Sequence, residues 1–433
     1  MSSLDLVTRT DITKALRSGT VPAVGLEHYA VGLDDQMEAI REQFAYVASG
    51  KSAYRFLRGA YGSGKTFLST LVTSEALEHD FLTSNVVVSV ADTPLFKLAQ
   101  VYRRVCGNLS SRSHRGGALQ SVVDRWLHQL EDTIIEVDGI DEKSPGFASA
   151  VGARVEQSLA PVGEKAGRMV ACLRAYHHCQ MKDDYPNARA LLDWMAGESK
   201  VSADIKRLAG VTGTLDNTDA LTFLRGLLEL VRAAGHKGLV LVLDEVETIT
   251  RQRRPERVKS LEVLRSLVDA IDKNEFPGLL LLVTGTPDFY DSSQGVAGVE
   301  ALHQRLHVEF REDRPDNFRM PQIRLRAFDQ VRLLAVARKV KEIYPATHPD
   351  RVARRVDDAL LQQMVTTVTK GFGGHIDVVP RMFLRELIQV LDLVDLHDYD
   401  PRTQYSFDAD RVADGLTDEE RERLTDQARD IYL

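Results

Sequence analysis

Short apolar segments alternate along this chain with longer segments of helical periodicity. The apolar segments span residues 53–59 (AYRFLRG), 85–94 (NVVVSVADTP), 239–243 (LVLVL) and 276–284 (FPGLLLLVT). Apolar runs of this length are typical of strands that are buried on both faces, as in a parallel sheet covered by helices. Between and after them, apolar residues recur every three or four positions, which predicts amphipathic helices. This alternation favours an α/β fold with a doubly wound parallel sheet.

Helical periodicity dominates three parts of the chain. Thr10 is the expected N-cap of a short helix that stops at Gly19, and a second helix is expected from about Asp34 to Gly50. Residues 113–236 are helical in pattern although they lie between the second and third expected strands, which predicts a large helical insertion. After residues 320–329 only helical patterns follow, and we expect a separate all-helical C-terminal domain there.

Composition and charge restrict the ligands and the cellular compartment that are expected for this protein. The chain has 433 residues, enough for two or three domains, with 43% hydrophobic residues, 27% charged residues and a formal charge of −8. Contact with nucleic acid would therefore depend on a local basic patch. No apolar run approaches the roughly 18 residues of a membrane span, and the first residues lack the apolar core of a signal peptide. We expect a cytoplasmic protein.

The cysteine and histidine pattern points to no metal centre. The three cysteines, Cys106, Cys172 and Cys179, fit a reducing compartment and lack the spacing of metal-ligand pairs. The sequence HHC at 177–179 favours a packed helix over a zinc site, because adjacent histidines cannot easily share a face and no second ligand cluster exists.

The segment FLRGAYGSGKTFLST, residues 56–70, fits the phosphate-loop pattern G-x-x-x-x-G-K-[ST], and it lies after a predicted strand and before a predicted helix. Glycines let backbone N–H groups face phosphates, and the positive end of the following helix adds to the attraction. Lys65 is expected on the β- and γ-phosphates and the Thr66 hydroxyl on Mg²⁺. The predicted nucleotide contacts are Gly59, Ala60, Tyr61, Gly62, Ser63, Gly64, Lys65, Thr66 and Phe67.

An acidic pair follows the third predicted strand, at the edge where ligands collect in open α/β sheets. Asp244 can hold Mg²⁺, usually through water, and Glu245 can polarise an attacking water. Thr284, or Thr286 two residues on, ends the next strand and can orient the same water. No N/T-K-x-D guanine reader occurs and no acceptor pocket is specified, so we predict hydrolysis of ATP.

Arginines supply candidate contacts to the transition state, where an arginine can contribute ~10³-fold or more in rate. Arg381, with Arg385 as the alternative, starts a C-terminal helix and can reach the γ-phosphate when that domain closes. Arg305 is our choice for an arginine acting in trans within a homo-oligomer, because Leu302 and Leu306 anchor its helix. Arg311 and Arg314 are the alternatives to Arg305.

A basic cluster, RQRRPERVK, spans residues 251–259. Arg251, Arg253, Arg254 and Arg257 are candidates for contact with a DNA backbone, which would make binding steeply salt-dependent. No aromatic residue interleaves them, so base stacking is not indicated, and a solvated charged turn is the alternative.

These motifs divide the chain into four parts. We assign residues 1–33 to an N-terminal helix and the segment before the sheet, 34–112 and 237–326 to an α/β nucleotide-binding domain, 113–236 to the helical insertion, and 327–433 to a helical lid domain.

The ordered motifs resemble those of AAA+ ATPases of the branch that includes origin-recognition initiators and signalling ATPases. Closer still, GTVPAVGLEHYAVGL, FLRGAYGSGKTF, DTPLFKLAQVYRRV, GLVLVLDEVETITR and VPRMFLRELIQVLD resemble the short ATP-binding proteins of BREX anti-phage defence systems, from about Gly19 to Asp395. The resemblance implies an intracellular defence ATPase that acts with a helicase or another DNA-processing partner. It also implies that His28, Tyr29 and Val31 lie near the adenine.

Three functions remain open from the sequence. The first is an oligomeric ATPase that remodels or loads a DNA-bound partner. The second is an ATP-dependent switch or signalling ATPase with slow hydrolysis and no direct DNA work. The third, a scaffold with a vestigial site, is disfavoured because every element of the phosphate chemistry is present.

Overall fold

The computed structural model describes residues 4–160, 167–371 and 379–404. The chain divides into two compact units. The sheet unit contains residues 36–58 and 72–323, and the helical unit contains the described residues of 1–35, 59–71 and 324–433. Both units are discontinuous in sequence.

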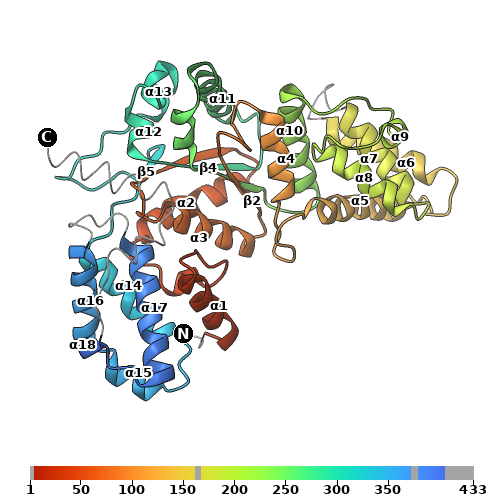
Figure 1. Cartoon of the computed structure of the whole chain (residues 1–433). Helices are drawn as coiled ribbons and strands as arrows, with labels where there is room; N and C mark the ends of the chain where they lie inside the picture. The colour runs from red at the N-terminus through yellow and green to blue at the C-terminus, as the bar shows by residue number, and fades with distance from the viewer. Residues whose placement is uncertain (1–3, 161–166, 372–378, 405–433) are drawn as a thin grey trace. The chain divides into compact units, whose positions relative to one another are not determined.

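A sheet of five strands, in the order β2-β3-β4-β1-β5, forms the centre of the sheet unit (Figure 1). The strands are β1 (Ala53–Arg58), β2 (Leu82–Val87), β3 (Leu239–Asp244), β4 (Leu279–Gly285) and β5 (Gln322–Arg324). β1 pairs with β4, β4 with β3 and β3 with β2, all in parallel. Every residue of β3 and β4 is buried, as their apolar sequences require. The predicted α/β fold with a parallel sheet is confirmed.

The prediction for the second strand was wrong in its bounds. β2 begins three residues earlier than expected, at Leu82, whose N–H donates to the carbonyl of Gly238. It ends at Val87, because the Ser89 hydroxyl accepts the N–H groups of Asp92 and Thr93 and folds the chain into a turn.

Helices follow the strands as the periodicity predicts. The helix expected from about Asp34 is α2, Asp34–Ala48, and the one after the phosphate loop is α3, Lys65–Glu78. The others that flank the sheet are η4 (Val246–Arg251), α4 (Leu98–Gly107), α11 (Arg254–Asp272), α12 (Pro287–Asp291), η5 (Val296–Gly298) and α13 (Glu300–Leu306).

In its described residues, the expected insertion contains six helices between α4 and β3, of which α5 to α9 lie beyond α4 and α10 (Figure 1). They are α5 (Leu119–Glu136), α6 (Phe147–Leu159), α7 (Gly167–Gln180), α8 (Tyr185–Met195), α9 (Ala203–Leu208) and α10 (Asn217–Ala233). Trp126, Trp194 and Phe223 belong to the same apolar core as Leu241 of β3. The insertion is therefore continuous with the sheet's own core.

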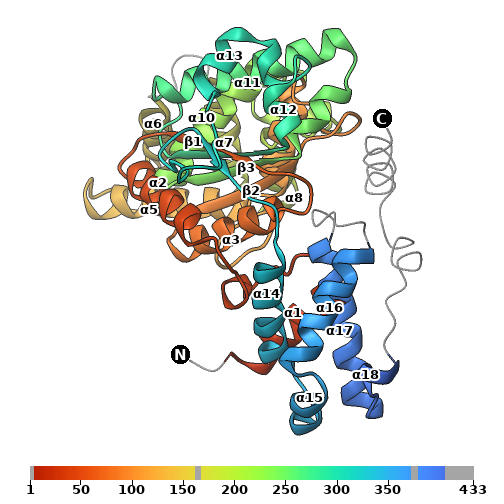
Figure 2. The same cartoon turned by 90° about the vertical axis from the view of Figure 1, so that its left-hand side faces the viewer.

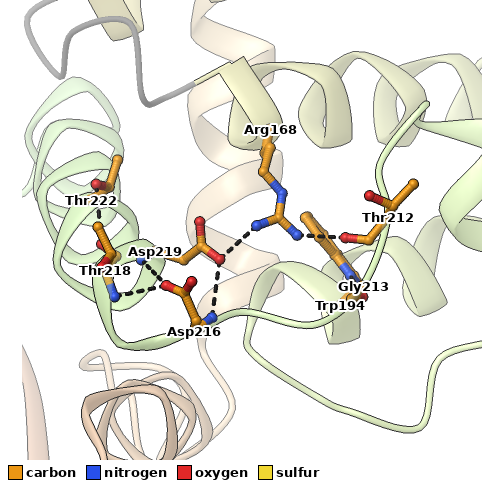
Figure 3. A network of polar contacts seen from close by, with 8 residues as sticks. All are labelled: Arg168, Trp194, Thr212, Gly213, Asp216, Thr218, Asp219 and Thr222. Carbon is orange, nitrogen blue, oxygen red and sulfur yellow. Dashed lines mark hydrogen bonds and ion pairs between the residues drawn. The ribbon is translucent and has the colours of Figure 1, made fainter.

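A polar network joins helices α7, α8 and α10 of the insertion (Figure 3). Arg168 of α7 pairs with Asp219 of α10 at 2.6 Å and donates to the carbonyl of Thr212 at 2.7 Å. Its guanidinium lies 5.0 Å from the ring centroid of Trp194 on α8. Asp216 caps α10 by accepting two backbone N–H groups. One arginine thus joins three helices through charge, hydrogen bonding and stacking.

The HHC sequence lies in α7, as expected of a packed helix. His177 is 5% exposed and its Nε2 lies 2.9 Å from the Glu131 carboxylate. This contact lowers the pKa of Glu131. Within the described residues, no group of three or more His, Cys, Asp or Glu side chains could hold a metal ion.

The helical unit has its own apolar core, to which α1, α14, α16 and α17 contribute (Figure 2). Its helices are α1 (Leu6–Arg17), η1 (Leu26–His28), α14 (Gln330–Ile343), α15 (Pro349–Arg355), α16 (Asp358–Gly371), α17 (Val379–His397) and α18 (Pro401–Gln404). Ile12 and Leu16 of α1 share this core with Phe383 of α17, and Arg17 makes a two-bond ion pair with Asp392 at 2.7 and 2.8 Å.

The predicted cap of the first helix was wrong. The N-cap of α1 is Asp5, whose carboxylate accepts the N–H of Thr8 at 2.9 Å. Thr10 lies inside the helix, and its hydroxyl donates to the carbonyl of Leu6. None of the described helices has the length and apolar character needed to cross a bilayer.

Candidate functional site

The phosphate loop begins at Gly59, directly after β1, and ends where α3 begins at Lys65. Gly62 and Gly64 have φ angles of 73° and 92°, a region that side chains with a Cβ rarely adopt. Position 59 requires glycine for a different reason, because a Cβ there would lie 2.3 Å from Oγ of Ser63. Ser63 is fixed in turn by its hydroxyl, which donates to the carbonyl of Ala60 at 2.7 Å. Three of the loop residues must therefore be glycine for this backbone to form.

Lys65 is folded back over the loop. Its side chain is 8% exposed, and Nζ donates to the carbonyls of Gly59 at 2.8 Å and Ala60 at 3.0 Å. The ammonium also lies 4.7 Å from the ring centroid of Tyr61. A cation is thus held within the turn at the positive end of α3, where an anion is favoured. Thr66 follows as an exposed residue in the first turn of the helix.

The acidic pair lies at the carboxyl end of β3. Asp244 is its last residue and is 4% exposed. Glu245 has φ 59° and ψ 40°, a left-handed conformation. The other described non-glycine residues with positive φ are aspartate or asparagine, which adopt it more readily than glutamate. Such strain costs about 1–3 kcal/mol and clusters at functional sites.

Thr284 joins the acidic pair from the neighbouring strand. It is fully buried, and its hydroxyl donates to Oδ1 of Asp244 while accepting the N–H of Glu245 at 3.1 Å. The same N–H also donates to Oδ1 of Asp244 at 3.1 Å. The structure therefore brings these three predicted residues together, through the Asp244 carboxylate, the Thr284 hydroxyl and the backbone N–H of Glu245. Thr286, the alternative, is the N-cap residue of α12 and is 8% exposed.

Glu247 is a residue that the sequence reasoning missed. It lies two residues after Glu245 in η4, is 6% exposed, and both of its carboxylate oxygens are buried without a hydrogen-bond partner. Burial, with the charge of Glu247 as the second cause, raises the pKa of Tyr290 well above its ordinary value. The available signal was a second glutamate at spacing two in the apolar sequence EVETI.

The candidate arginines are engaged in different ways. Nε of Arg305 lies 2.5 Å from the Asp269 carboxylate on α11 of the same chain, and its side chain is 39% exposed. Arg311 and Arg314 are exposed and both lie near Glu309, at 2.7 and 3.6 Å.

The arginines of the C-terminal domain lie on α17. Arg381 and Arg385 are both exposed. Nε of Arg381 lies 3.1 Å from where a Cβ of Gly19 would be, so it packs against the segment after α1 within the helical unit.

The basic cluster separates into two kinds of residue. Arg251, Arg253 and Arg254 are exposed at the end of η4 and the start of α11. Arg257 is partly buried and donates to the carbonyls of Thr250 and Gln252, both at 3.3 Å. Arg257 thus stabilises the end of η4.

The predicted adenine-side residues belong to the helical unit. Tyr29 is 3% exposed and packs edge to face on Phe67 of α3, with ring centroids 5.2 Å apart. Val31 is partly buried against the same core, and His28 is exposed with its ring 3.2 Å from Glu27. Tyr29 and Phe67 therefore connect the segment after α1 to the phosphate-loop helix.

A loop of the phosphate-loop pattern after β1, an Asp-Glu pair at the end of β3 and a threonine at the end of the strand between them form the pattern that is typical of P-loop nucleotide-binding proteins. The family model described as "BREX system ATP-binding protein BrxC/D" matches residues 6–409. The chain belongs to this family, as the resemblance of its motifs predicted.

Two further comparisons complete the picture. No curated protein matches the sequence. Among solved structures, the chain is similar to the ORC2 protein of Aeropyrum pernix in its ADPNP–ADP complexes, with 11% identity and a TM-score of 0.42 over 89% of this chain and 67% of that one.

Proposed function

We propose that this protein is a Mg²⁺-dependent ATPase that works in BREX defence. The observation that carries the proposal is the strained Glu245 beside the buried Asp244. A glutamate in this conformation, whose N–H donates to Oδ1 of Asp244 and to the Thr284 hydroxyl, is a costly arrangement of the kind that clusters at functional sites. A fixed carboxylate at this edge can polarise a water molecule for attack on a phosphate.

Strand order supports the proposal, because the strands that lead into the loop and into the acidic pair lie close together in the sheet. β4 lies between β1 and β3, and adjacent strands are about 4.8 Å apart, so the carboxyl ends of β1 and β3 are separated by about 10 Å. The phosphate loop follows the first of these ends in the chain, and Glu245 follows the second. A triphosphate spans a distance of this order.

The roles follow from the chemistry of each group. The loop N–H groups and Lys65 would bind the phosphates, and Glu245 would hold the attacking water. The Thr66 hydroxyl and the Asp244 carboxylate are oxygen donors of the kind that Mg²⁺ prefers, and the ion supplies charge neutralisation when bound. Thr284 would keep the Asp244 carboxylate in one orientation.

The proposal also assigns roles to arginines in a homo-oligomer and in contact with partners. Arg305 would act in trans in a homo-oligomer after exchanging its bond to Asp269 for the neighbour's phosphate. Arg381 would contact the nucleotide from α17. The exposed Arg251, Arg253 and Arg254 would contact DNA during work with a helicase or another component of the defence system.

The decisive experiment compares binding with turnover. Lys65→Ala should abolish ATP binding, whereas Glu245→Gln should bind ATP and lose at least about 100-fold in hydrolysis rate, as is typical when general-base catalysis is removed. Lys14→Ala, at an exposed position of α1, is the control and should keep both. Normal turnover by Glu245→Gln would refute the assignment.

The oligomer requires its own measurement. Arg305→Ala should bind ATP without turnover, and mixing it with Lys65→Ala should restore part of the activity, because each variant supplies what the other lacks. Mass measurement in solution with a non-hydrolysable ATP analogue, with and without duplex DNA, reports assembly. A monomer under every condition would exclude action in trans.

A further inference from the structure

A cavity of about 380 Å³ lies in the sheet unit at the amino end of β1, the opposite end of that strand from the one the phosphate loop follows. Its walls come from the end of α2, the start of β1, the end of α11 and the segment that leads into β5. The phosphate chemistry described above does not use any of these residues.

The cavity is strongly cationic. Four basic side chains line it, Lys51, Arg55, Lys273 and Arg319, against one carboxylate, Asp272. That carboxylate lies close to the Tyr54 hydroxyl and to the opposite charge of Arg305. In a chain with a formal charge of −8, such a concentration of positive charge within one small cavity favours an anionic ligand.

Arg55, which lines the cavity, has a buried donor without a partner. One of its terminal nitrogens donates to the carbonyl of Tyr54 at 2.8 Å, but its Nε is buried without a hydrogen-bond partner. Removal from water lowers the pKa of Arg55 from its ordinary value. A buried donor without a partner destabilises the folded state. An oxyanion bound in the cavity can accept hydrogen bonds from the Arg55 guanidinium, because guanidinium groups match phosphate oxygens in geometry.

The floor of the cavity is held by its own hydrogen bonds. The Ser52 hydroxyl donates to the carbonyl of Ile271 at 2.9 Å and lies 3.1 Å from Oδ1 of Asn274. Asn274, with φ 56°, donates to the carbonyl of Gly50 at 3.4 Å. These bonds fix the start of β1 against the end of α11, so the site exists before any ligand arrives.

An aromatic ring stands beside the cations. Tyr46, in the last turn of α2, lines the cavity and is 50% exposed. An exposed tyrosine next to phosphate-binding cations offers a stacking surface for a base. The volume lies at the small end of the range for small-molecule pockets, which suits one nucleotide and excludes a strand running through it.

We propose that this cavity is a second nucleotide site, in which Lys51, Arg55 and Arg319 bind the phosphate and Tyr46 stacks on the base. The phosphate belongs to a free mononucleotide or to the phosphorylated end of a strand. This site is independent of the phosphate loop and of the proposed ATPase.

The test uses the full chain carrying Lys65→Ala, so that the phosphate loop does not contribute. Three probes are titrated by calorimetry: AMP, a 5′-phosphorylated trinucleotide and the same trinucleotide with a 5′-hydroxyl. The phosphorylated probes should bind and the hydroxyl probe should not. Binding of AMP as well as the trinucleotide indicates a free nucleotide, and binding of the phosphorylated trinucleotide alone indicates a strand end.

Cavity variants then locate the binding. Arg319→Ala and Lys51→Ala, both at exposed positions, should each weaken binding of the phosphorylated probes at least about fivefold. Tyr46→Ala should weaken the binding of AMP but leave the binding of pyrophosphate, which has no base, unchanged. Arg207→Ala, an exposed arginine of α9, is the matched control. Absence of binding by every phosphorylated probe, or binding that Arg319→Ala leaves unchanged, overturns the proposal. ATP hydrolysis by the protein without Lys65→Ala tests the ATPase separately.

Discussion

Replacing Thr284 by valine isolates the bond that holds the acidic pair. Valine keeps the branched shape of threonine in this fully buried position and removes only the hydroxyl. Two contacts are lost, the donation to the Asp244 carboxylate and the acceptance of the Glu245 N–H. A hydrogen bond to a charged group contributes about 1.5–3 kcal/mol. The Glu245 N–H keeps its second acceptor, Oδ1 of Asp244, so the loss of its contact with Thr284 adds little to the cost of the substitution. We expect a loss of about 2 kcal/mol in the free energy of unfolding.

The two tryptophans of the chain make this loss measurable in the correct unit. Trp126 and Trp194 are at most 1% exposed and lie in the core of the sheet unit, as Thr284 does. Urea unfolding followed by tryptophan fluorescence therefore reports this unit. With a slope of about 3 kcal/mol per molar urea, the midpoint should fall by about 0.7 M.

Thr222→Val is the matched control for Thr284→Val. Thr222 is also buried in the sheet unit, but its hydroxyl donates to the carbonyl of Thr218 in its own helix, at 3.4 Å. Its replacement should cost less than about 0.5 kcal/mol, because that carbonyl belongs to the regular helix ladder. Equal midpoints for the two variants would show that the Thr284 hydroxyl does not hold the carboxylate.

Two other substitutions test local geometry. Gly59→Ala would place a methyl group 2.3 Å from Oγ of Ser63, and overpacking of about 1–3 kcal/mol should weaken ATP binding roughly 5- to 150-fold in a fluorescence titration. Gly107→Ala, where a Cβ meets no atom within 4 Å, should change nothing, and unchanged affinity in both would contradict the loop geometry. Glu131→Gln tests the pH dependence of stability. Because His177 lowers the pKa of Glu131 in the fold from 4.5, its stabilisation is present above pH 4.5 and lost as the pH falls through the lowered value. The variant should melt below the wild type at pH 7 and converge with it once the pH has fallen below the lowered pKa of Glu131, and a constant difference in melting temperature would argue against the pairing.

The sequence predicted those parts of the fold that apolar pattern controls. β3 and β4 are buried along their whole length, and both were visible as unbroken apolar runs. The family resemblance was also correct, because its motifs have fixed spacing. The roles of the individual site residues remain predictions.

Buried polar residues explain what pattern could not predict. β2 was misplaced because Thr83 and Ser84 are 5% and 1% exposed although they are polar. The backbone of Thr83 pairs with Ser110, and the Ser84 hydroxyl donates to the carbonyl of Val105. These partners come from distant sequence, so hydropathy along the strand does not reveal them. The same holds for Arg305, whose partner Asp269 lies on a different helix.

The pairing of α1 with α17 has a consequence for synthesis on the ribosome. Arg17 and Asp392, which join the two helices, are 375 positions apart in the chain. At about 5–20 residues per second, translation separates their appearance by roughly 20 to 75 s. During that interval Ile12 and Leu16 have no α17 to cover them, so the nascent chain carries an uncovered apolar stripe. Pausing or chaperone binding over this period should therefore affect the yield of folded protein more than its final stability.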